Sequence, residues 1–170
     1  MLQKCGYNRV LEVFFKEPTK VHFIRGISKN INLATTSVKK YIDRLSKENL
    51  IIQKESGPFK GYIANREEDK FIFYKQIYNL YSLYELKTKI ILEIGPQAIV
   101  LFGSYQKGED IEGSDIDLAI FTKIKKEINV KKFEDSLNRH VHITYIENIN
   151  KIEKNLQENL RGGWIIYGKI

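Results

Sequence analysis

The chain has 170 residues, of which 42% are hydrophobic and 29% are charged, which is the composition of a globular protein with one ordinary domain or two small ones. No apolar run is long enough to cross a bilayer, and the charged N-terminal residues do not form a secretory signal. Cys5 is the single cysteine, so it cannot form an internal disulfide or a metal site made of cysteines. These features predict a cytoplasmic protein.

The charge is distributed unevenly along the chain. The net charge is +7, and residues 1–92 contain 17 Lys and Arg against 9 Asp and Glu, whereas residues 93–170 contain 11 against 12. A basic half attracts polyanions such as nucleic acid. The competing interpretation is a lysine-rich surface that binds no particular partner.

Three helices are predicted in the basic half. The first covers residues 7–15 and ends before Pro18. Residues 21–50 predict two further helices separated by a turn, because Asn30 and Asn32 have side chains that bond readily to their own backbone in turns.

A β-hairpin is predicted to follow. Residues 50–54 and 61–64 predict its two strands, and Ser56-Gly57-Pro58 interrupts them. Three helices and a hairpin in this order resemble a winged helix-turn-helix, which we expect to occupy residues 1–64. The alternative to DNA binding is a module for protein interaction or dimerisation, since a fold does not prove a function.

The third predicted helix has an apolar stripe and an opposite polar face. The stripe comprises Ala34, Val38, Tyr41, Ile42 and Leu45. Short polar side chains and cations suit the DNA major groove and its phosphates. The predicted nucleic-acid-binding residues are Thr35, Thr36, Lys39, Lys40 and Arg44, with Lys60 near the tip of the hairpin. Lys47 extends the same face, which could equally be a solvated surface.

Residues 65–92 predict one long connecting helix. Aromatic and aliphatic side chains repeat along it at nearly helical steps: Phe71, Tyr74, Ile77, Tyr78, Tyr81, Tyr84 and Leu86. We expect this stripe to pack between the two halves of the chain or to form the seam of a homodimer, in preference to stacking on a nucleotide.

Two aspartates beside a buried strand provide the strongest chemical signal. Residues 98–102 form a continuous apolar run, typical of a strand buried on both faces. A second apolar run follows Asp117, and Asp115 lies two residues before Asp117. Because alternate strand residues share a face, we expect both carboxylates to point the same way. Two like charges at that spacing repel each other, and a divalent cation such as Mg²⁺ relieves the repulsion.

Phosphate-binding groups are predicted where the first of these strands ends. Gly103 lets the backbone approach a phosphate closely, and Ser104 can offer a hydroxyl and a backbone N–H. Lys107 lies close enough in the sequence to neutralise the charge of a triphosphate.

Gly103-Ser104, followed after ten residues by Asp115-Ile116-Asp117-Leu118, resembles the signature of the nucleotidyltransferase superfamily of DNA polymerase beta, and most of all its minimal prokaryotic branch. The resemblance covers residues 93–170. It implies that the glycine-serine pair contacts the triphosphate and that the aspartates hold magnesium. The expected fold is α+β: a winged helix-turn-helix joined by a helix to a small nucleotidyltransferase domain with a mixed sheet.

One position departs from the family pattern. Active members usually have a third carboxylate on a neighbouring strand, and the matching residue of strand 140–145 is His142. His142 could bind a metal, favouring manganese or zinc, it could act as a general base, or its presence could mark a site that binds nucleotide without transferring it. We also expect His140 and Thr144 to face the aspartates. Other candidate carboxylates are Glu134, Asp135 and Glu147.

The predicted function is transfer of a nucleoside monophosphate from ATP or another NTP to an acceptor hydroxyl. Asp115 and Asp117 would hold Mg²⁺ or Mn²⁺, with His142 as the third catalytic residue. The resemblance implies that a partner toxin protein could be the acceptor, with the chain as antitoxin. The rival hypothesis is a DNA-binding transcriptional regulator whose nucleotidyltransferase-like domain is weak or inactive.

Overall fold

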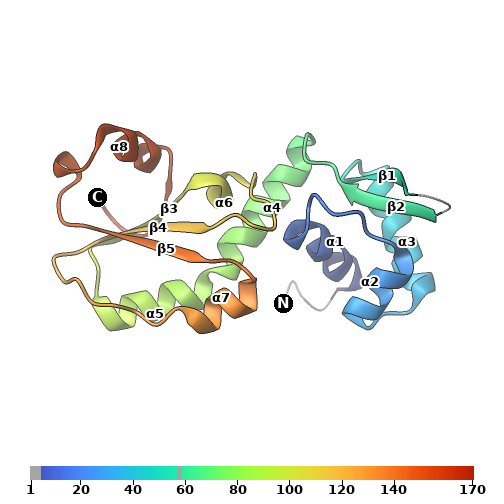
Figure 1. Cartoon of the computed structure of the whole chain (residues 1–170), viewed down its shortest axis with the longest axis horizontal. Coiled ribbons are helices and arrows are strands. Elements are labelled where there is room, and N and C mark those ends of the chain that lie inside the picture. The colour runs from blue at the N-terminus through green and yellow to red at the C-terminus, as the bar shows by residue number, and fades with distance from the viewer. Residues whose placement is uncertain (1–4, 57–58) are drawn as a thin grey trace. The chain divides into compact units, whose positions relative to one another are not determined.

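The chain forms two compact units, Met1–Lys75 and Gln76–Ile170. The structure is a computed structural model and describes residues 5–56 and 59–170 (Figure 1). Among these residues, none of the helices has the length and apolar character that a bilayer crossing requires.

The first unit contains three helices and a two-stranded antiparallel sheet. Their bounds are α1 Gly6–Lys16, α2 Ile24–Ile31, α3 Thr35–Lys47, β1 Ile51–Ser56 and β2 Phe59–Ala64. The predicted order of helices and hairpin is confirmed. Of the predicted break between the strands, Gly57 and Pro58 lie outside the described residues. His22, before α2, adds an isolated bridge to Tyr62 of β2.

Apolar side chains at helical spacing build the core of the first unit. Val10 and Phe14 of α1 and Val38 and Ile42 of α3 are fully buried, as their i, i+4 spacing requires for one face of a helix. The predicted turn is also present, since Asn32 ends α2 in the left-handed region with a φ of +48°. Ala34 and Tyr41 differ from the rest of the predicted stripe: Ala34 is the exposed N-cap of α3, and Tyr41 is only half-buried.

Two helices, α4 (Asp69–Ser82) and α5 (Tyr84–Ile94), replace the single helix predicted for residues 65–92. The break lies at Leu83. Ser82 Oγ donates a hydrogen bond to the carbonyl oxygen of Asn79 at 2.7 Å. The same Oγ lies 2.8 Å from the hydroxyl of Tyr105. A serine hydroxyl that bonds to a backbone carbonyl one turn earlier can bend a helix, and this bond lies directly before the interruption.

The second unit is built on a four-stranded mixed sheet. Its strands are β3 Ala98–Phe102, β4 Ile116–Phe121, β5 Val141–Ile146 and β6 Trp164–Gly168, in the order β5-β4-β3-β6. β3 is antiparallel to β4 and β6, while β4 and β5 are parallel. A parallel pair needs a crossover connection, which here contains α7 (Lys131–Leu137).

Helices cover both faces of this sheet (Figure 1). The remaining elements are α6 Gly103–Lys107, the short η2 Ile149–Lys151 and α8 Lys154–Arg161. Side chains of α5 and α7 pack on the face that contains Ile99 and Leu118. Those of α8 pack on the face that contains Val100 and Ala119. All five residues of β3 are buried, which confirms the prediction of a strand buried on both faces.

Candidate active site

Asp117 lies on the face of the sheet that α8 covers, near the start of β4. It pairs with Phe102 at the end of β3 and with His142 on β5. Ile116 and Leu118 point to the opposite face, where they are buried, as the predicted alternation requires. The Asp117 side chain is 28% exposed, so its carboxylate is accessible to a ligand although the strand is buried.

Gly103 follows β3 and leaves space for the Asp117 carboxylate. Its φ is +77°, a conformation that favours glycine. A Cβ built at this position would lie 2.4 Å from Asp117 Oδ2. Glycine is therefore favoured here by the backbone conformation, and a side chain at this position would make the Asp117 carboxylate move.

His142 is the cross-strand neighbour of Asp117. It is one of the three residues, with His140 and Thr144, that the sequence predicts to face the aspartates. Its Nδ1 lies 3.3 Å from Asp117 Oδ1, and its side chain is 59% exposed. His140 instead lies just before β5, with its Nδ1 2.6 Å from Glu134 Oε1. Thr144 is on β5 beside Ala119 of β4, two residues further along the sheet than Asp117.

Asp115 lies in the segment just before β4, and its side chain is exposed. Within residues 5–56 and 59–170, neither Asp115 nor Asp117 forms an ion pair with Lys or Arg, so neither charge is neutralised by a cationic side chain. The same residues contain no group of three or more His, Cys, Asp and Glu side chains arranged to hold a metal ion.

The two other predicted phosphate ligands lie on α6. Ser104 is half-buried in its first turn, and Lys107 is exposed in its last turn. Gln76 Nε2 donates to the carbonyl oxygen of Lys107 at 3.2 Å, which ties the end of α6 to α4. The side chains of both residues are therefore close in the chain to Gly103 and carried by one short, anchored helix.

The other candidate carboxylates are engaged in interactions of their own. Glu134 accepts a hydrogen bond from the backbone N–H of Val141 at 3.0 Å. That hydrogen bond, followed by the contact with His140, lowers the pKa of the Glu134 carboxyl. Asp135 forms an ion pair with Lys131 at 2.8 Å, and Glu147 one with Lys125 at 3.8 Å. These interactions do not favour any of the three as the third ligand.

Sequence reasoning missed a buried polar group next to α6. It comprises Asn79, Asp110 and Arg139, which are 1%, 1% and 8% exposed. No local pattern distinguishes them from the many exposed Asn, Asp and Arg residues of the chain, because their burial depends on three separate segments. Nearby, burial raises the pKa of Tyr105 to about 12, so its hydroxyl stays neutral.

The exposed face of α3 contains all six side chains predicted from its sequence. Lys39, Lys40 and Lys47 are exposed. Arg44 is also exposed, but its Nε donates to Glu48 Oε1 at 2.9 Å and its guanidinium lies 4.4 Å from the centre of the Tyr7 ring. The lysines are therefore the stronger candidates for phosphate contacts.

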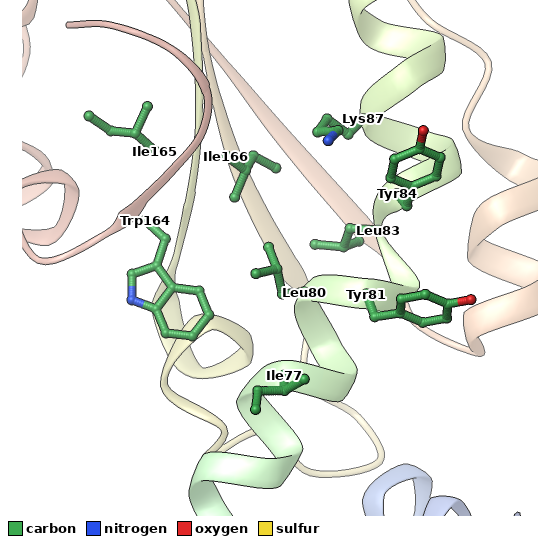
Figure 2. A pocket seen from close by; sticks show the side chains of 9 residues that line it. All are labelled: Ile77, Leu80, Tyr81, Leu83, Tyr84, Lys87, Trp164, Ile165 and Ile166. Atoms are coloured by element: carbon green, nitrogen blue, oxygen red, sulfur yellow. The ribbon is translucent and has the colours of Figure 1, made fainter. Parts of the chain in front are cut away.

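An apolar groove of about 580 Å³ lies elsewhere in the second unit. Figure 2 shows side chains of α4 and α5 on one side of it and those of β6 on the other. Ile77, Tyr81 and Tyr84 belong to the predicted apolar stripe and are 44%, 47% and 62% exposed, whereas Phe71 and Leu86 are buried. The stripe is thus only partly in the core, and its role as a dimer seam stays a prediction.

Comparisons with known proteins bear on the second unit. Residues 83–163 match the family model described as a nucleotidyltransferase domain. This part of the chain is similar to nucleotidyltransferase domains. The match begins at Leu83, includes α5, Gly103 at the start of α6, and the strands with Asp117 and His142, and ends just before β6. The match supports nucleotidyl transfer in general terms.

The chain also has a structural neighbour among solved structures. A solved structure described as "Crystal structure of the toxin-antitoxin with AMP-PNP" is 24% identical, with a TM-score of 0.37, and the similarity covers 55% of this chain and 72% of that chain. The description belongs to that structure, and so low a TM-score does not carry it over to this chain. The comparison with curated proteins finds no match.

Proposed function

We propose that the chain transfers a nucleoside monophosphate from an NTP to an acceptor hydroxyl. The observation that carries the proposal is the position of the Asp117 carboxylate. It lies against Gly103 at the end of β3 and against His142 on β5, in the domain that matches the nucleotidyltransferase family. Three strands thus meet at one accessible carboxylate.

Asp115 and Asp117 are the proposed ligands of a divalent metal, Mg²⁺ or Mn²⁺. The residues fit such an ion, because Asp115 is exposed, the Asp117 side chain is 28% exposed, and neither carboxylate forms an ion pair with Lys or Arg in the described part of the chain. Mg²⁺ is commonly bound by one or two carboxylates together with substrate phosphates, so a third protein ligand is not required. When bound, the metal would stabilise negative charge on the attacking and leaving oxygens.

Gly103, Ser104 and Lys107 are proposed to bind the triphosphate. Gly103 lets the backbone come close to the phosphate, Ser104 offers its hydroxyl, and the exposed Lys107 ammonium can neutralise charge. Held in this way, the α-phosphorus is oriented for in-line attack by the acceptor hydroxyl. The new P–O bond forms as the bond to pyrophosphate breaks, and the hydroxyl proton leaves to solvent or to a base.

His142 is proposed to orient Asp117, since Nδ1 lies 3.3 Å from Oδ1. The acceptor is proposed to be a hydroxyl of a partner protein, following the resemblance to minimal nucleotidyltransferases, with the chain as an antitoxin and the partner as a toxin. The role of His142 and the identity of the acceptor can be tested independently of each other.

The function is tested with each of the four NTPs labelled at the α-phosphorus, in the presence of Mg²⁺ or Mn²⁺. The purified chain is incubated with candidate acceptor proteins, including products of adjacent genes. We expect transfer of the label with release of pyrophosphate, and loss of transfer in Asp117→Asn by at least about 100-fold, because metal-ion stabilisation amounts to several kcal/mol. The proposal is wrong if labelled NTP binds to neither protein and no acceptor takes up label.

A second candidate function is DNA binding by the first unit. The exposed face of α3 supports it, with Lys39, Lys40 and Lys47 next to Thr35 and Thr36. In this hypothesis α3 enters the major groove, Lys60 on β2 contacts phosphate, and the nucleotidyltransferase domain senses nucleotide. Such a regulator would bind DNA with a strong salt dependence and would show no label transfer.

A further inference from the structure

A cluster of three buried polar side chains lies beside the candidate active site, and the catalytic proposal does not use it. The Asp110 cluster, as we call it, consists of Asn79 on α4, Asp110 after α6 and Arg139 before β5. Their exposed fractions are 1%, 1% and 8%. Burying a carboxylate and a guanidinium is costly unless both are paired and hydrogen-bonded, so the arrangement requires a specific set of partners.

Both carboxylate oxygens of Asp110 have a donor. Asn79 Nδ2 donates to Asp110 Oδ1 at 2.8 Å, and Arg139 Nη2 lies 3.4 Å from Asp110 Oδ2. Asn79 Nδ2 also donates to the backbone carbonyl of Tyr105 on α6 at 2.8 Å. One carboxylate is thereby connected to α4 and to the turn before β5.

The same cluster reaches the segment that leads to Asp115. Arg139 Nη1 donates to the carbonyl oxygen of Glu112 at 2.7 Å. At the two ends of the segment, the N–H of Glu109 donates to the carbonyl of Ser104, and the N–H of Ile116 to the carbonyl of His140, at 3.0 and 2.8 Å. Residues 109–115 are therefore held at both ends by backbone hydrogen bonds and in the middle by Asp110 and Arg139.

We propose that Asn79, Asp110 and Arg139 are positioning residues for the metal and nucleotide site. They act through the backbone of residues 109–115, which brings the exposed Asp115 to the start of β4, next to Asp117. An exposed loop carboxylate would otherwise lose conformational freedom on binding the metal, and holding its backbone in place in advance removes part of that cost. The inference rests on the proposed function, since it assigns to the same site residues that hold its backbone in place.

The alternative is a purely structural role, because a buried ion pair can serve the fold alone. The two roles differ in what is lost on mutation. Asn79→Leu removes both donated hydrogen bonds with little change in volume, and Asp110→Asn removes the charge with less perturbation. Ile94→Ala is the matched control: Ile94 is 5% exposed in the core of the same unit, at the end of α5, and takes no part in the cluster.

The test has two measurements on the full chain. The first is hydrogen–deuterium exchange of peptides covering residues 108–116. The second is the dissociation constant for ATP with Mn²⁺, followed by electron paramagnetic resonance of the free ion. At equal loss of melting temperature, we expect the Asn79 and Asp110 variants to exchange at least tenfold faster in this segment, and to bind ATP with Mn²⁺ at least tenfold more weakly, than Ile94→Ala.

Equal exchange and equal affinity in the cluster variants and in Ile94→Ala would overturn the proposal in favour of a purely structural role. Faster exchange with unchanged affinity would overturn it as well, because the segment would then be held without serving the site. If the wild-type chain binds no ATP with Mn²⁺, the proposed function fails, whereas the exchange measurement still decides whether the cluster holds residues 109–115. Should Asn79→Leu not fold, Asp110→Asn carries the comparison.

Discussion

The carboxylate of Asp117 occupies the space into which a side chain at position 103 would project. A Cβ at Gly103 would lie 2.4 Å from Asp117 Oδ2, closer than van der Waals contact allows. The glycine after β3 therefore leaves room for Asp117 near the start of β4, and the proposed catalysis depends on Asp117. Each part of this relationship can be tested separately.

Replacing Gly103 by Ala should displace Asp117 and abolish most nucleotide transfer. The backbone penalty at a φ of +77° is about 1–2 kcal/mol for a residue with a Cβ, and the clash with the carboxylate adds to it. Transfer of α-labelled NTP and the melting temperature are the measurements. We expect activity to fall at least about tenfold more than it would from the backbone penalty at position 103 alone.

Gly95→Ala provides the control for that prediction. Gly95 has a φ of +59° and has no atom within 4 Å of a built Cβ. It should lose similar stability and keep its activity. Equal loss of activity in the two variants would mean that the space beside Asp117 is not used.

Replacing His142 by Asp should shift the metal preference from Mn²⁺ toward Mg²⁺. A carboxylate at this position would lie next to Asp117 on the parallel strand β5, and Mg²⁺ prefers oxygen to nitrogen ligands. The ratio of activity with Mg²⁺ to activity with Mn²⁺ is the measurement, and we expect it to rise roughly tenfold. An unchanged ratio would place His142 outside the metal site, and His140→Asp serves as the control because His140 contacts Glu134 instead.

Glu134→Gln should remove a pH-dependent part of the stability. The pKa of Glu134 is lowered in the folded chain, first by the Val141 N–H and then by His140. A lowered pKa means that the ionised carboxylate stabilises the fold above the ordinary value of 4.5, and that this stabilisation is lost as the pH falls through the folded-state pKa. Urea unfolding between pH 3 and pH 7 measures the difference between wild type and variant.

We expect that difference to be constant above about pH 5 and to shrink below pH 4.5. Glu153→Gln is the control, because Glu153 precedes α8 and its side chain makes no capping hydrogen bond. A difference that stays constant down to pH 3 would contradict the assigned cause of the pKa shift.

The double variant Lys39→Glu, Lys40→Glu should weaken DNA binding if α3 contacts DNA. Both lysines are exposed on α3, and each lost phosphate contact reduces the slope of log affinity against log salt by about 1. Binding to duplex DNA at several salt concentrations is the measurement. Lys154→Glu, an exposed charge change at the start of α8, should leave the slope unchanged; equal effects would indicate a response to net charge alone.

Several elements of the fold were predictable because their signals are local. The apolar run 98–102 became β3, the alternation around Asp117 became β4, and Asn32 ended α2 with a positive φ. The single helix predicted for residues 65–92 was wrong, since α4 and α5 are separated at Leu83, next to Ser82, which bonds to the hydroxyl of Tyr105, a residue far along the chain. A periodicity cannot reveal a competing partner that is distant in sequence.

The chemical groups of the candidate site, and the strands that carry them, were predictable from the sequence, because strand alternation and glycine at a strand end are properties of neighbouring residues. Which of these groups meet depends on how distant segments pack. The parallel pairing of β4 with β5 brought His142 rather than His140 to Asp117, and three separate segments buried Asp110 with Arg139. The physical reason is that burial and contact depend on strand register and on packing between distant segments, which no short stretch of sequence contains.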